Sequence, residues 1–145
     1  MKAELYDVIQ HKIEEKINYF NHLIEDLRAS NNDTKSSMGD KYETSREMMQ
    51  QEITRIQNQL NDVLIQQDIF SKLKIIDNPI VGLGSYVETS MGNFCIACSF
   101  GEIENNGKKI FILSTQTPLV KELIGKSKND LFEINNKSFQ ILEVN

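Results

Sequence analysis

Apolar residues recur every three or four positions through the first half of the chain and form two stripes. The first stripe comprises Leu5, Ile9, Ile13, Ile17, Phe20, Ile24 and Leu27, and the second comprises Ile53, Ile56, Leu60, Val63 and Phe70. Such spacing places each stripe on one face of an α-helix. A polar segment rich in turn-forming residues, 29–40, separates the two stripes. We therefore predict an antiparallel helical hairpin, a coiled coil, whose arms of about thirty residues each extend roughly 45 Å.

In the second half of the chain, short runs alternate apolar and polar positions and are broken by glycine or by Asn-Gly. Five such runs predict β-strands over residues 85–88, 93–99, 109–113, 131–134 and 138–144. A helix is predicted among them, with Thr117 as N-cap, Pro118 at the first helical position and Gly125 as terminator. The predicted fold class is α+β, with the N-terminal hairpin followed by a small β-rich domain that carries one short helix.

The boundary between the two patterns lies at Asp77-Asn78-Pro79. Both prolines and six of the seven glycines come after residue 77. Proline disfavours helix in the residue before it, so Pro79 ends the long run without glycine or proline that precedes it. We predict two domains, the hairpin over residues 1–77 with its tip near 31–43, and the C-terminal domain over residues 78–145.

Composition excludes several classes of protein. The chain has 145 residues, 39% of them hydrophobic, and 16 basic against 21 acidic side chains give a net charge of -5. This hydrophobic fraction can build a core, which argues against a wholly disordered chain. The acidic balance argues against a free-standing nucleic-acid binder. Since neither a signal peptide nor a membrane span is recognisable, we expect a soluble, cytoplasmic protein without membrane association.

Two carboxylates, Asp40 and Glu43, stand three residues apart where the second helix is predicted to begin. They fit a capping arrangement, with Asp40 as N-cap and Glu43 at the third helical position, or with Ser37 and Asp40 in those roles one register earlier. They also fit a presented pair of hard oxygen ligands. Mg²⁺ takes six oxygens, so two carboxylates would complete a site whose other ligands belong to a partner. The two interpretations are compatible.

Other candidate motifs have structural explanations. Cys95 and Cys98 form a C-x-x-C inside a predicted strand, where residues three apart face opposite sides, and we expect buried or half-buried thiols. His11 and His22 have no metal-ligating neighbours in sequence and are expected at the surface. The Gly82-Leu83-Gly84 segment lacks the remainder of a dinucleotide fingerprint and is predicted to turn into the first strand.

Two segments together resemble the bacterial Gre transcript-cleavage factors. Gly39-Asp40-Lys41-Tyr42-Glu43 matches the Gly-Asp-x-x-Glu spacing of the acidic tip in that family. Residues 114–126 look like the family's Ser-Pro-Leu/Ile…Leu-x-Gly-Lys segment, and Asp130 follows in the Gly-Asp position before the penultimate strand. Gly82-x-Gly84-Ser85 also looks like the family's first-strand approach. With the hairpin and the boundary position, the resemblance covers nearly the whole chain.

The resemblance implies a transcription elongation factor that binds the secondary channel of RNA polymerase. By the same resemblance, the C-terminal domain would have an FKBP-like fold and would dock at the channel mouth. The expected polymerase-binding residues are Pro118, Leu119 and Lys126. Asp40 and Glu43 correspond to the acidic pair that helps to hold a Mg²⁺ shared with the polymerase active site, and the free protein is expected to bind none. The factor would stimulate the polymerase's cleavage of backtracked RNA rather than act as an enzyme alone, and we expect it to be a monomer.

The chain departs from the family pattern at two places. Cleavage factors usually continue the tip with Asn-Ala-Glu-Tyr, where this chain has Thr44-Ser45-Arg46-Glu47, and the glycine before Asp130 is replaced by Asn129. It therefore resembles a divergent Gre-like homologue rather than a standard cleavage factor, and the alternative function is a channel-binding regulator or inhibitor of polymerase without cleavage activity. Two other classes are a peptidyl-prolyl isomerase, which needs an aromatic-lined pocket, and a coiled-coil assembly module, which would pair the stripes between chains.

Overall fold

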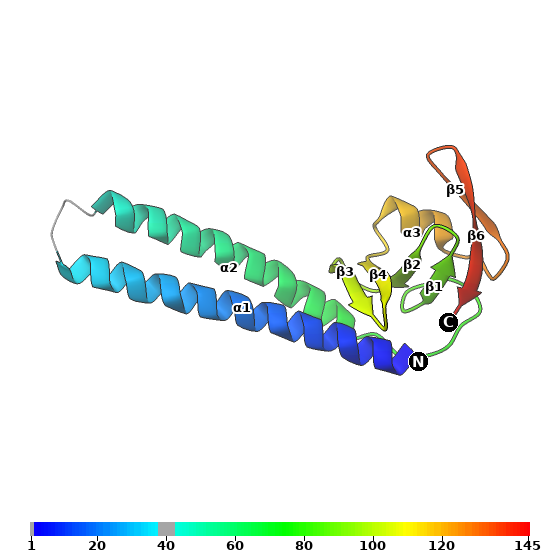
Figure 1. Ribbon diagram of the computed structural model, residues 1–145, viewed down its shortest axis with the longest axis horizontal. Coiled ribbons are helices and arrows are strands. Elements are labelled where there is room, and N and C mark those ends of the chain that lie inside the picture. Colours follow the sequence, from blue (N-terminus) through cyan, green and yellow to red (C-terminus); the bar gives the residue numbers. More distant parts are fainter. Residues whose placement is uncertain (1, 38–42) are drawn as a thin grey trace. The chain divides into compact units, whose positions relative to one another are not determined.

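The computed structural model describes the backbone of residues 2–37 and 43–145 and the side chains of residues 2–30 and 45–145. The elements in chain order are α1 (Lys2–Ser37), α2 (Glu43–Ser71), β1 (Tyr86–Thr89), β2 (Asn93–Ile96), β3 (Gly101–Asn105), β4 (Lys108–Leu113), α3 (Pro118–Leu123), β5 (Leu131–Ile134) and β6 (Lys137–Val144) (Figure 1). This order confirms the predicted fold class, α+β with an N-terminal helical hairpin and a β-rich domain that contains one short helix. The chain forms two compact units, Lys12–Ile65 and a second made of Met1–His11 with Gln66–Asn145.

The unit Lys12–Ile65 is a two-helix hairpin held together by the predicted stripes (Figure 1). From α1 it buries Ile13, Phe20 and Ile24, and from α2 it buries Ile53, Ile56 and Val63. Polar side chains occupy most of the outer positions. Because the stripes cover one another within one chain, they are unavailable for the pairing between chains that a coiled-coil assembly module would need.

The second unit contains a six-stranded sheet with the strand order β3-β4-β2-β1-β6-β5. Neighbouring strands are antiparallel except β2 and β4, which are parallel. Two-residue turns connect β3 to β4 and β5 to β6. Their residues all have positive φ, 53° and 77° at Asn106 and Gly107 and 52° and 67° at Asn135 and Asn136. That geometry matches the twist of the strands, and asparagine and glycine adopt it most readily.

Strand β3 is the main correction to the sequence-based prediction, which had five strands. It contributes one buried side chain, Ile103, between exposed Glu102 and Glu104. It lies at an edge of the sheet, where charged residues discourage pairing with other chains. The signal that could have revealed it was Asn106-Gly107, because such a turn requires a strand on each side. Strand β2 is also shorter than predicted and ends at Ile96, not at Ser99.

The sheet is buried on both faces. On one face, Val120 and Leu123 of α3 pack into a core with side chains of the sheet and the segment before it, namely Val81, Val87, Phe94, Ile96, Phe132 and Ile141. On the other face, β1, β2 and β4 bury Tyr86, Cys95 and Ile112. The first turns of α1 belong to this unit, and their Leu5, Tyr6 and Ile9 are buried as well.

Candidate functional site

The acidic pair falls at the connection between the two long helices. Helix α1 ends at Ser37 and α2 begins at Glu43. Asp40 lies outside the described residues, and so does the side chain of Glu43, although its backbone opens α2. The donor set fits a partial Mg²⁺ site, because carboxylate oxygens are hard ligands and two residues leave most of the six positions to a partner. Among the side chains that the structure does describe, no three His, Cys, Asp or Glu gather as a metal site.

The three residues expected to contact polymerase lie on α3 and its C-terminal turn. Pro118 begins the helix and is exposed, and Lys126 follows its end and is half-buried. Leu119 packs partly against the hydrophobic core, so it also has a structural role. Thr117 occupies the predicted N-cap position with extended backbone, but its side chain makes no capping hydrogen bond. Pro118 and Lys126 therefore lie at opposite ends of α3.

The segment after α3 explains why Asn129 replaces the expected glycine. Asn129 has φ of 75°, in the left-handed region that glycine adopts most easily and that asparagine tolerates better than most residues. Its N–H donates to the carbonyl of Ile141 at 2.8 Å. The carboxylate of Asp130 accepts the N–H of Ser127 at 2.8 Å, which closes the turn. The substitution therefore keeps a backbone conformation that glycine would also supply.

The two cysteines are buried free thiols, as expected from the sequence. Burial raises the pKa of Cys95 to about 12, with a further contribution from Cys98. Burial likewise raises the pKa of Cys98 to about 11. A thiol must lose its proton to attack a disulfide or to bind zinc. At neutral pH these two are protonated and act as small apolar groups in the core. His11 and His22 are exposed, also as expected.

A cluster of buried polar groups ties the start of α1 to the sheet domain, and the sequence reasoning missed it. The Lys2 ammonium donates to the carbonyls of Ile76 at 2.8 Å and Asn145 at 3.2 Å. The Tyr6 hydroxyl donates to the carbonyl of Gly84 at 2.7 Å. Burial lowers the pKa of Lys2 and raises the pKa of Tyr6. These bonds join residues remote in sequence, so no local pattern could have signalled them.

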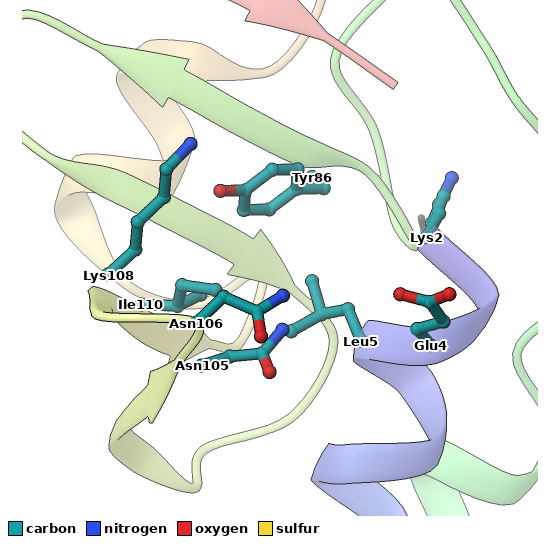
Figure 2. Close-up of a pocket in the computed structure, with 8 residues that line it drawn as sticks. All are labelled: Lys2, Glu4, Leu5, Tyr86, Asn105, Asn106, Lys108 and Ile110. Carbon is teal, nitrogen blue, oxygen red and sulfur yellow. The ribbon is translucent and has the colours of Figure 1, made fainter.

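Beside this cluster lies a cavity of about 200 Å³ (Figure 2). Leu5, Tyr86 and Ile110 supply its apolar lining, and the polar lining comes from Lys2, Glu4, Asn105, Asn106 and Lys108. Figure 2 shows Leu5 reaching from α1 toward the ring of Tyr86. Burial, helped by Glu88, raises the pKa of the Tyr86 hydroxyl to about 12, so it serves as a neutral hydrogen-bonding group.

Aromatic residues of the sheet unit, on which a peptidyl-prolyl isomerase pocket would depend, are taken up by the hydrophobic core. Phe94 and Phe132 are only 4% and 3% exposed and belong to the core beneath α3. Tyr86 is the aromatic residue among those lining the cavity in Figure 2. Since an aromatic-lined concavity is the basis of that alternative, the described side chains give it no support. In the described part of the chain, no helix is long and apolar enough to span a membrane.

Comparisons with known proteins give distant similarities in structure. No protein-family model matches the chain, and no curated protein matches it. The crystal structure of GreA factor homologue 1 from Thermus thermophilus aligns with a TM-score of 0.39 at 17% identity, covering 94% of both chains. A structure described as the transcription factor Gfh1 gives 0.38 at 17% identity, covering 93% of this chain and 92% of that one. Gfh1 of Thermus aquaticus gives 0.37 at 17% identity, covering 92% of each. At this level of overlap the similarity identifies neither family nor function.

Proposed function

We propose that this chain is a Gre-like transcription elongation factor that binds RNA polymerase through its secondary channel and stimulates the polymerase's cleavage of backtracked RNA. The observation that carries the proposal is the position of Asp40 and Glu43, which fall where α1 gives way to α2. Gly39-Asp40-x-x-Glu43 matches the spacing of the acidic tip in the Gre factors, and this segment comes between the end of α1 at Ser37 and the first turn of α2, which supports the proposal.

The lengths of the helices support this role. Helix α1 has 36 residues and α2 has 29. At 1.5 Å per residue, these correspond to about 54 Å and about 44 Å along each helix. The connection between the helices is therefore several turns removed from the residues at their other ends. A hairpin of this length can present two carboxylates at a distance from the surface that anchors the protein.

Under this proposal the factor itself supplies only two carboxylates to the reaction. A second divalent ion in the polymerase active site supplies charge stabilisation for the attacking water and the RNA phosphate. Asp40 and Glu43 would contribute oxygen ligands to its shell and accept a hydrogen bond that orients the water, while polymerase supplies the remaining ligands. The factor has no catalytic cycle of its own under this proposal. The net charge of -5 is compatible with it, because the partner is a protein that already holds the RNA.

Stalled, backtracked elongation complexes test the proposal. Wild-type protein should shorten the RNA from its 3′ end, whereas Asp40→Asn and Glu43→Gln should lose most of that stimulation and keep polymerase binding. Glu47→Gln is the matched control, because it removes an exposed carboxylate one turn further along α2 and should cleave like wild type. If wild type produces no shortened RNA, the cleavage mechanism is wrong.

A second candidate function is a channel-binding regulator or inhibitor without cleavage activity. Thr44-Ser45-Arg46-Glu47 favours it, because these residues replace the Asn-Ala-Glu-Tyr that usually follows the acidic pair in cleavage factors. The same assay separates the two functions. A wild-type protein that binds polymerase and slows elongation, with no shortened RNA, would establish the regulator.

A further inference from the structure

The segment that follows α2 exposes an unusual number of large aliphatic side chains. Ile75, Ile76, Ile80 and Leu83 are 51%, 63%, 52% and 58% exposed, within nine consecutive residues. Single exposed aliphatic residues are common on protein surfaces, but a cluster rimmed by polar groups is typical of an interaction site. All four lie in the compact unit that contains the sheet.

This segment also forms one wall of a groove of about 320 Å³. Leu73, Ile76 and Leu83 provide apolar lining, and Gly82, Gly84 and Ser85 form the facing turn. We call it the linker groove, defined by residues 72–74, 76, 78 and 82–85. A volume of this size accommodates one or two side chains of a partner rather than a large ligand.

The turn that lines the linker groove is held in place by hydrogen bonds. Gly84 donates its N–H to the carbonyl of Ile96 at 2.6 Å and accepts the Tyr6 hydroxyl at 2.7 Å. The Gly82 N–H donates to the Ser85 hydroxyl at 3.0 Å. With φ of 91°, Gly84 adopts a conformation in which other residues are strained. The groove wall is therefore formed before any partner arrives, which lowers the entropic cost of binding.

The charge of the linker groove is opposite to that of the whole chain. Its charged lining residues are Lys72 and Lys74, and no carboxylate is among the residues that line it. Lys72 pairs with exposed Asp68 at 2.9 Å, whereas no salt bridge to Lys74 is found among the described residues. Because Asp68 already pairs with Lys72, Lys74 supplies the positive charge at the groove, and in a protein with a net charge of -5 this favours an acidic partner segment.

The segment that enters the linker groove is paired with the segment that contains Lys126, a residue already expected to contact polymerase. Ile80 forms a β-bridge with Ser127, and the Val81 N–H donates to the carbonyl of Lys126 at 2.8 Å. The strand-like piece that leads into the groove thus lies directly beside Lys126. An extended partner could contact both.

We propose that the linker groove is a docking site for an acidic segment of RNA polymerase that inserts an aliphatic or aromatic side chain into the groove and pairs a carboxylate with Lys74. The inference rests on the proposed function, because it takes polymerase as the partner. It assigns the main apolar contact to Leu83 and Ile76 and the electrostatic contact to Lys74. Pro118 and Leu119 are not part of this groove.

The test is the affinity of the full chain for RNA polymerase, measured by fluorescence anisotropy with a label at an exposed hairpin position. Leu83→Ser should weaken binding about tenfold or more, the loss expected when a central apolar contact is removed. Lys74→Glu should weaken binding similarly and reduce its dependence on salt. Leu142→Ser and Lys137→Glu are the matched controls, because both residues are exposed in the same unit and outside the groove.

The outcomes separate the docking site from the function. Wild-type binding that Leu83→Ser and Lys74→Glu leave unchanged would overturn the groove while the proposed function stands. If the control variants weaken binding as much as the groove variants, the linker groove is not the docking site, and the proposed function still stands. Wild-type protein that does not bind polymerase overturns both. Circular dichroism of each variant checks that the fold is intact, as expected for exposed positions.

Discussion

Because the Cys95 thiol is buried, the free energy of unfolding should fall as the pH rises in the alkaline range. In the folded chain, burial raises the pKa of Cys95 from 9.0 to about 12. The unfolded chain exposes this thiol and ionises it near its ordinary pKa. Because the folded pKa lies above the unfolded one, the stabilising contribution is complete below pH 9 and is lost as the pH rises toward 12.

The size of the loss follows from these two values. At pH 10 the thiol in the unfolded chain is mostly ionised and gains about 1.4 kcal/mol that the folded chain, still protonated, does not gain. The side chain is fully buried, so solvent screening does little to reduce this figure. The free energy of unfolding should therefore fall by about 1.4 kcal/mol between pH 8 and pH 10 on account of Cys95 alone.

Urea unfolding at pH 8 and pH 10, under reducing conditions, measures this effect. Cys95→Ala should be less stable than wild type at pH 8 but should lose about 1.4 kcal/mol less on going to pH 10. Ala97→Gly is the control, because it also removes a buried side chain, directly after the end of β2, without removing a titrating group. Burial also raises the pKa of Cys98, to about 11, so its thiol adds a pH dependence of its own, and this contribution is present in both proteins.

Equal pH dependence in wild type and Cys95→Ala would contradict the raised pKa of Cys95. It would mean that the thiol ionises at a similar pH in the folded and unfolded chains, so that burial does not hold it protonated. A smaller pH dependence in Ala97→Gly as well would show that general loosening of the core, rather than the removed thiol, produces the difference.

Three other substitutions test the backbone and the polar cluster. Gly84→Ala should cost about 1–2 kcal/mol of unfolding free energy, because φ is 91° and the new Cβ would lie 3.2 Å from the Tyr6 hydroxyl oxygen. Gly82→Ala is the control in the same urea titration, and it should cost much less because nothing lies within 4 Å of its new Cβ. Asn129→Val should cost about 1–2 kcal/mol and Asn129→Gly little, because φ is 75°; equal losses would contradict the left-handed assignment. Lys2→Met should lower the unfolding free energy by about 1–3 kcal/mol because two carbonyls lose their donor, and an unchanged thermal midpoint would show that water replaces the ammonium.

Much of the secondary structure was recoverable from local patterns. The stripes predicted both long helices because a helical period of three to four positions is a property of neighbouring residues. Pro118 and Gly125 marked the short helix for the same reason, since each acts on the backbone at its own position. Strand β3 escaped because an edge strand with one buried residue, Ile103, has almost no alternating pattern.

For the candidate site, residue types and their spacing were enough to predict an acidic pair, Asp40 and Glu43, between two helices, and to predict that Cys95 and Cys98 are buried thiols. The tertiary structure alone decided the parallel pairing of β2 with β4, the burial of Lys2 and the linker groove. The bonds from Lys2 span 74 and 143 positions of sequence. Helix and strand periods report interactions over a few residues, whereas burial and charge at a surface depend on which distant segments the fold brings together.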